Sequence, residues 1–252
     1  MIRLLLAVLV ATSCFAQVER VDNPAILASF ANRTFAQLVD GDSWKTEITI
    51  MNLNEGFEGF TMRFYGDDGQ PLTLSFVDLG NRSLITAALP PFGSVTYRTT
   101  GGLGPLKQGW GRIEFNTGVA ATAVIRSEVP GRVPLEAVVP FDEDLTRRVA
   151  IPYDHLNGFL TGLALANTSE FSSITIQLNF RDESGASIFT TSFPLGPRRH
   201  RAFVLSWEYP NMANRKGILE ISGGNLQMGI VGLRFGPTGA FSTILPMDNI
   251  GW

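Results

Sequence analysis

The sequence predicts an all-β protein made of two tandem antiparallel β-sandwich domains that derive from an internal duplication. The stretch 44–52, Trp-Lys-Thr-Glu-Ile-Thr-Ile-Met-Asn, has aliphatic residues at every second position, the period of a strand with one buried face. The stretch 159–167 repeats the pattern: an aromatic, Thr two residues later, alternating aliphatics and a closing Asn. The Asn suits a strand exit, because its side chain can bond nearby backbone.

Composition supports this class and excludes others. The 252 residues suffice for one large or two ordinary domains. Phe, Gly, Thr and Pro are plentiful and long Ala/Glu/Lys-rich stretches are missing, which favours strands over helices. The chain has 20 basic and 23 acidic residues, a net charge of −3, and no long basic run. We therefore expect no nucleic-acid partner.

The first 16 residues have the features of an export signal, which is kept out of the fold. Arg3 is the charged region, and 4–10 is an apolar segment too short to span a bilayer as a helix. Small residues at 14 and 16 predict cleavage before Gln17. Alternatively, 10–14 resembles a lipoprotein signal, in which Cys14 would be lipidated and anchor the protein. We expect an extracellular, periplasmic or outer-surface location and no transmembrane helix in the mature chain.

Cys14 is the only cysteine in the chain. If it leaves with the leader, the mature protein has no thiol, so cysteine catalysis and thiolate metal sites are excluded. An exported domain without disulfides must be held by its core alone, which is feasible at about 100 residues per domain.

The predicted elements follow in order, after an N-terminal segment at 17–34. The first domain is expected at 35–141, and the second at 151–252, after a charged linker at 142–150 that has no hydrophobic period. Asp67-Asp68-Gly69 predicts a hairpin turn. Strands of the first domain are expected at 35–39, 44–52, 60–65, 72–76, 84–89, 94–99, 111–115, 120–125 and 135–139.

The second copy repeats the landmarks of the first in the same order. Strands separated by about 8–12 residues, with Gly/Pro/Asp turns, indicate a sandwich, with a barrel as the alternative. The copy has an excursion at 206–216, expected to hold a short helix with Trp207 and Tyr209 covering one end of the core. The matching pairs across the copies include Trp44/Phe159, Trp110/Lys216, Glu114/Glu220 and Arg126/Arg234.

Several runs resemble repeats of uncharacterised exported bacterial proteins. They are 35–37 (Phe-Ala-Gln) followed by 44–46 (Trp-Lys-Thr), 108–114 (Gln-Gly-Trp-Gly-Arg-Ile-Glu) and 129–132 (Val-Pro-Gly-Arg). The resemblance covers nearly all of the mature chain and implies tandem immunoglobulin-like sandwiches and export. It implies no catalytic residue.

No catalytic, cofactor-binding or metal-binding residue is predicted. His155 and His200 are expected in solvent-facing loops, without the partners that a zinc site or a catalytic triad needs. Residues 142–144 (Asp-Glu-Asp), with Asp154, could gather a hard cation such as calcium, but a solvated linker is the simpler interpretation. The run 198–201 (Arg-Arg-His-Arg) could contact anionic glycans or lipid headgroups, but again a solvated turn is simpler.

Aromatic residues are the more informative candidates. Trp44 is in phase with the buried aliphatics and is expected in the core. Trp110 matches Lys216, so we expect it to face solvent and to contact a glycan, the other domain or another protein. The sequence thus favours a non-enzymatic structural or binding protein at the cell surface or outside it, with other surface proteins or glycans as partners. A carbohydrate-binding module using Trp110 is the alternative, and an unfamiliar hydrolase is a remote one.

Overall fold

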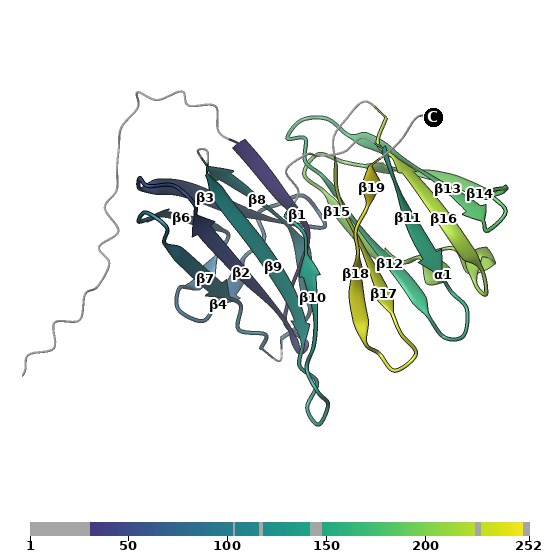
Figure 1. Cartoon of the computed structure of the whole chain (residues 1–252), viewed down its shortest axis with the longest axis horizontal. Helices are drawn as coiled ribbons and strands as arrows, with labels where there is room; N and C mark the ends of the chain where they lie inside the picture. The colour runs from purple at the N-terminus through teal and green to yellow at the C-terminus, as the bar shows by residue number, and fades with distance from the viewer. Residues whose placement is uncertain (1–30, 103, 116–117, 142–147, 225–227, 249–252) are drawn as a thin grey trace, which may run out of the picture.

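The computed structural model describes residues 31–102, 104–115, 118–141, 148–224 and 228–248. The expected leader, Cys14 and the acidic stretch 142–144 lie outside these residues. The described chain is all-β, and its strands form two groups that lie side by side (Figure 1). Among the described residues, no helix is long and apolar enough to cross a membrane.

The first half of the chain forms two four-stranded antiparallel sheets. Its strands are β1 (Ala31–Asp40), β2 (Trp44–Asn52), β3 (Glu58–Gly66), β4 (Leu74–Phe76), β5 (Gly80–Arg82), β6 (Leu84–Leu89), β7 (Ser94–Arg98), β8 (Lys107–Phe115), β9 (Val119–Ser127) and β10 (Leu135–Val139). One sheet has the order β1-β8-β3-β6 and the other β10-β9-β2-β7, while β4 and β5 form a separate small ribbon.

The second half has the same arrangement. Its elements are β11 (Arg148–Asp154), β12 (Leu160–Asn167), β13 (Ile174–Asp182), β14 (Ser187–Leu195), β15 (His200–Val204), α1 (Leu205–Glu208), a 3-10 turn (Pro210–Met212), β16 (Lys216–Ser222), β17 (Met228–Phe235), β18 (Phe241–Ile244) and β19 (Met247–Asp248). Its sheets are β19-β11-β16-β13-β14 and β18-β17-β12-β15. Apart from β19, each strand has a counterpart at the same place in the first half.

Most predicted strands are found within a few residues, and two predicted boundaries differ. β1 begins at Ala31, inside the segment expected to precede the first domain. β11 begins at Arg148, so the last three residues of the expected linker belong to a strand. The short helix expected in the excursion is α1.

Each half buries an apolar core between its two sheets, so each is sandwich-like. Ile48 and Ile50 of β2 face Met62 and Phe64 of β3 in the first core, and all four are fully buried. In the second half, Leu163 and Leu165 of β12 have the same place, opposite Leu178 and Phe180 of β13. The strand period therefore selects the predicted faces.

The polar ends of the repeated strand make matching hydrogen bonds. The Thr46 hydroxyl donates to the Val39 carbonyl at 2.7 Å and accepts from the Val39 N–H at 3.0 Å. The Thr161 hydroxyl makes the same two contacts with Asp154, at 3.4 and 3.0 Å. Thr46 and Thr161 are fully buried. The bonds of Thr46 satisfy buried backbone groups of Val39, and those of Thr161 satisfy partly buried groups of Asp154.

The strand registers correct one predicted pairing of charged residues. Thr46 lies opposite Ile125, and Thr161 lies opposite Arg234. Arg234 therefore corresponds to Ile125, not to Arg126, which is one residue further along its strand. A shift of one residue reverses the face of a strand. Arg126 and Arg234 accordingly point to opposite faces of their sheets.

The predicted correspondence between residues of β8 in the first half and β16 in the second half is wrong by two residues. Phe64 lies opposite Gly111, and its counterpart Phe180 lies opposite Leu219. Trp110, which precedes Gly111, therefore matches Ile218, which precedes Leu219. By the same register Glu220 matches Arg112, not Glu114, and Lys216 matches Gln108.

Candidate functional site

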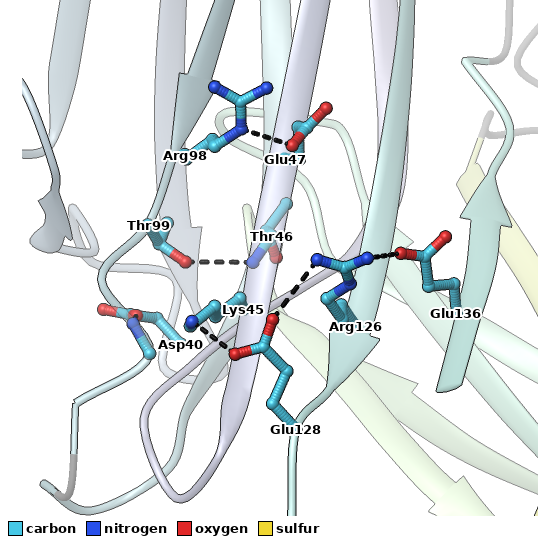
Figure 2. Close-up of polar contacts among 10 residues, drawn as sticks. Asp40, Lys45, Thr46, Glu47, Arg98, Thr99, Arg126, Glu128 and Glu136 are labelled. Atoms are coloured by element: carbon cyan, nitrogen blue, oxygen red, sulfur yellow. Dashed lines mark hydrogen bonds and ion pairs between the residues drawn. The ribbon is translucent and has the colours of Figure 1, made fainter. Parts of the chain in front are cut away.

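One candidate site is a charged surface on β2 and its neighbours (Figure 2). Glu128 accepts hydrogen bonds from Lys45 at 2.5 Å and from Arg126 at 3.3 Å, and Arg126 also pairs with Glu136. Beside them, Arg98 pairs with Glu47 at 2.5 Å. These side chains line a shallow hollow of about 290 Å³.

The charges on this surface are already satisfied by one another. The hydrogen bond from Lys45 holds the pKa of Glu128 below its ordinary value, which keeps that carboxylate ionised and paired. A carboxyl group poised for acid catalysis would show the opposite shift. The surface is therefore best interpreted as a lattice of cross-strand ion pairs that supports the sheet.

A second region lies between the halves and contains Trp110, for which the prediction of a solvent-facing side chain is wrong. Trp110 does not face solvent: it is fully buried, stacks on Tyr65 and donates its indole N–H to the Arg198 carbonyl at 2.7 Å. Of the three contacts proposed for it, the structure shows the one with the other domain. Arg112 adds hydrogen bonds to the Thr168 carbonyl and, at 3.1 Å, to Glu170.

The same junction overturns the predictions for His200 and the basic run. His200 is buried, and its Nδ1 lies 2.6 Å from Asp67 Oδ1 of the first half. Arg198 places its guanidinium over the Tyr65 ring. The run 198–201 is thus partly an interdomain contact rather than a solvated turn.

His155 is also buried, contrary to the prediction. Its Nδ1 lies 2.8 Å from the Met212 carbonyl, so the ring ties β11 to the turn after α1. Burial lowers the pKa of His155, and the contacts with Met212 and Asp154 offset only part of this effect. The imidazole is therefore held neutral, and its role is structural.

A groove of about 800 Å³ lies between the two halves and is lined by residues of both. Its floor is the outer face of the β12, β15 and β17 sheet. Ala164 on this face packs with the core of the first half, together with Val231. Small or apolar residues form the floor: Gly162, Ala164, Ala202, Val204, Leu233 and Phe235.

The opposite wall of the groove comes from the first half. Val39 of β1 is buried there, and Trp44 packs its ring against Phe241 of β18 at 5.3 Å between centroids. Trp44 has the predicted phase but is only partly buried, because it lies at the junction and not at the centre of a core. Leu106 and Trp207 form the rim, and 72% of Trp207 is exposed, so it does not cover the core.

Gln37 lies in this wall, and its side-chain amide oxygen lacks a hydrogen-bond donor among the described residues. Only 6% of the residue is exposed, and its Oε1 is buried with no hydrogen-bond partner among the described residues. A buried amide oxygen without a partner costs about 1–3 kcal/mol. The groove thus has a mainly apolar lining that includes the polar side chains of Gln37, Gln108 and Glu208, the usual character of a ligand site.

The described residues contain no group of three or more His, Cys, Asp or Glu side chains placed to hold a metal ion. Among the described residues, each carboxyl group whose pKa clearly departs from its ordinary value has a lowered pKa. An acidic pair with shifted pKa values in a deep pocket, which would favour a hydrolase, is therefore not seen in this part of the chain. That the protein is not an enzyme stays a prediction.

No protein-family model, curated protein or solved structure matches this chain. The resemblance to exported bacterial repeat proteins therefore stays a prediction.

Sequence reasoning missed the groove, although a signal was present. In β2 the residues between the buried positions are Lys45, Glu47, Thr49 and Met51, whereas in β12 they are Gly162, Ala164 and Ala166. A strand that is apolar at every position is typical of one covered on both faces. The sequence of β12 therefore indicates a contact on its outer face.

Proposed function

We propose that this chain is a non-enzymatic, exported binding protein that holds an apolar ligand in the groove between its halves. The observation that carries the proposal is the groove: about 800 Å³, with a floor of small or apolar residues and with Leu106 and Trp207 beside Gln108 and Glu208 in its lining. This volume lies in the range of sites for small molecules, roughly 300–1,000 Å³. The ligand we infer is a mostly apolar small molecule.

The proposal includes two immunoglobulin-like sandwiches that derive from one duplicated unit. The shared strand order supports it, as do the matching side-chain bonds of Thr46 and Thr161.

Export rests on the leader, in two forms. Either the chain is cleaved before Gln17, or Cys14 is lipidated and anchors the protein. The intact mass of the protein from the producing cell distinguishes the two. A protein found only in the cytosol with residues 1–16 retained would contradict export.

The test of binding is recovery of the natural ligand. Native mass spectrometry of protein purified from its producing cell should show an added small-molecule mass. Ala202→Trp, which fills the groove from the edge strand β15, should lose that mass. Thr190→Trp, on the exposed edge strand β14, is the matched control and should keep it. The same mass on Ala202→Trp would place the ligand elsewhere.

Carbohydrate binding remains the second candidate, with a different residue. Trp110 cannot stack on a sugar because it is buried. Trp207 can, since 72% of it is exposed at the rim, beside the Arg201–Glu208 ion pair at 2.6 Å. A glycan array in which wild type binds and Trp207→Ala does not would favour this function. No binding by the wild type would argue against it.

A further inference from the structure

The first half carries three exposed apolar side chains on two touching loops. Leu53, Phe57 and Phe92, called the tip below, are 58%, 76% and 69% exposed. Phe92 donates its backbone N–H to the Asn54 carbonyl at 3.2 Å, which joins the turn after β6 to the loop after β2. Phe92 also has φ 54°, a conformation that a bulky residue rarely adopts. An exposed aromatic kept in a strained turn points to a contact surface.

The turn that carries Phe92 has a counterpart in the second half. The N–H of Asn52 bonds the carbonyl of Gly93, and the N–H of Asn167 bonds the carbonyl of Arg199. Arg198 precedes Arg199 with φ 56°, as Phe92 precedes Gly93 with φ 54°. Phe92 therefore stands in the first half where Arg198 stands in the second.

In the second half this turn is docked. The Arg198 carbonyl accepts the Trp110 indole N–H, on the outer face of β8. The preceding Pro197 lies against the hairpin turn of the first half: a Cβ added to Gly69 would come within 2.6 Å of the Pro197 carbonyl oxygen. The loops at this end of one half thus sit on the outer sheet face of the other half. The contact joins two unlike surfaces, a loop end and a sheet face. The loop end of the first half and the sheet face of the second half therefore remain without this contact.

The unused sheet face lies on the second half. Ile218 occupies the position of Trp110 and is 47% exposed. Gly185 occupies the position of Gly69, and a Cβ added there meets no atom within 4 Å. A hollow of about 580 Å³ lies at this place. Pro152, Gly185 and Ile218 line it, together with the charged side chains of Asp154, Asp182, Glu183 and Lys216. The site that receives a loop end in the first half is therefore open in the second.

We propose that the tip of one copy of this chain docks in this hollow of a second copy. The tip and the hollow both differ from the matching residues of the contact between the two halves. Arg198 is replaced by Phe92 on the loop, and Trp110 by Ile218 on the face, which converts a polar contact into an apolar one. The ion pair of Arg112 has no counterpart, because Glu220 stands in its place. The association therefore depends on the apolar contact of the tip.

Such a contact is head to tail, so it generates rings or open chains of molecules. The proposal does not depend on the groove or its ligand. Wild-type protein should show an average mass that rises with concentration in sedimentation velocity experiments. Phe92→Asn, which suits a positive φ, and Ile218→Asp should each weaken association at least about tenfold. Phe171→Ser removes an 89% exposed aromatic outside both surfaces and should leave it unchanged.

Mixing the two variants tests the head-to-tail geometry. Phe92→Asn keeps an intact hollow and Ile218→Asp keeps an intact tip, so an equimolar mixture should form dimers and nothing larger. Circular dichroism of each variant confirms its fold. A wild type that stays monomeric to millimolar concentration would overturn the proposal. So would single variants that associate like wild type, or a mixture that stays monomeric.

Discussion

Asn52 and Asn167 end matching strands of the two halves and make the same hydrogen bonds with their side chains. The Asn52 amide donates to the carbonyls of Gly56, Leu89 and Pro90 at 2.7, 3.3 and 2.9 Å. The Asn167 amide donates to the carbonyls of Ser172, Leu195 and Gly196 at 2.8, 2.9 and 2.8 Å. Each oxygen accepts the N–H two residues on. One buried amide thus ties a strand exit to two neighbouring segments.

This relationship predicts that both asparagines are critical for stability. Asn52→Ala and Asn167→Ala should each lower the free energy of unfolding by about 2 kcal/mol or more, because buried carbonyls lose their donors. Urea denaturation measures the loss. Asn81→Ala, at an exposed position, is the control and should change it little. Losses below about 0.5 kcal/mol at both buried sites would contradict the account.

The buried hydroxyls predict a second effect. Thr46→Val keeps the shape of the side chain but removes both contacts with Val39, so unfolding should become easier by about 1–3 kcal/mol. Thr161→Val should have the same effect in the second half. Thr86→Val, whose hydroxyl lies 3.2 Å from that of Thr61 on an exposed surface, is the control. Equal stability of all three variants would mean that the hydroxyl bonds contribute nothing.

Replacement of Trp110 and of Trp207 should have different effects on stability. Trp110→Ala should destabilise the protein by about 3–5 kcal/mol, because a fully buried aromatic and its hydrogen bond to Arg198 are lost. Trp207→Ala should stay within about 0.5 kcal/mol. Denaturation followed by circular dichroism avoids the loss of a fluorescent reporter. A mild effect at Trp110 would restore the interpretation of this residue as a surface contact.

His155 predicts a pH dependence with a defined sign. Its pKa in the folded protein lies below the ordinary 6.5, because burial disfavours the charged ring. The stability that this group contributes is therefore present above pH 6.5 and is lost as the pH falls through the folded pKa. Wild type should lose more stability than His155→Asn between pH 7.5 and 5, since Asn keeps a donor but does not titrate there. Equal losses would show that His155 is not held neutral.

The strand pattern and the strand exits were predictable because they depend on local sequence. Period-two aliphatics select the buried face, and an Asn after such a run has backbone groups within reach. The position of α1 also followed from a local break in the pattern. These features need no knowledge of the partner half.

The fate of Trp110 was not predictable by the same means. Matching it to Lys216 was two residues out of register, because the segments between the strands differ in length between the copies. A single sequence also cannot show which outer face meets the other half. His200 and Arg198 were misjudged for the same reason: their turn reads as solvated, and only the docking of the two halves buries it.

The binding groove is the central claim, and a titration with 1-anilinonaphthalene-8-sulfonate tests it most directly. This probe is an anion whose aromatic rings fluoresce strongly when they leave water for an apolar site. Wild type and Thr190→Trp should bind it equally, and Ala202→Trp should bind it at least about tenfold more weakly, because the added ring occupies the groove. Unchanged binding by Ala202→Trp, with the fold intact by circular dichroism, would contradict the claim.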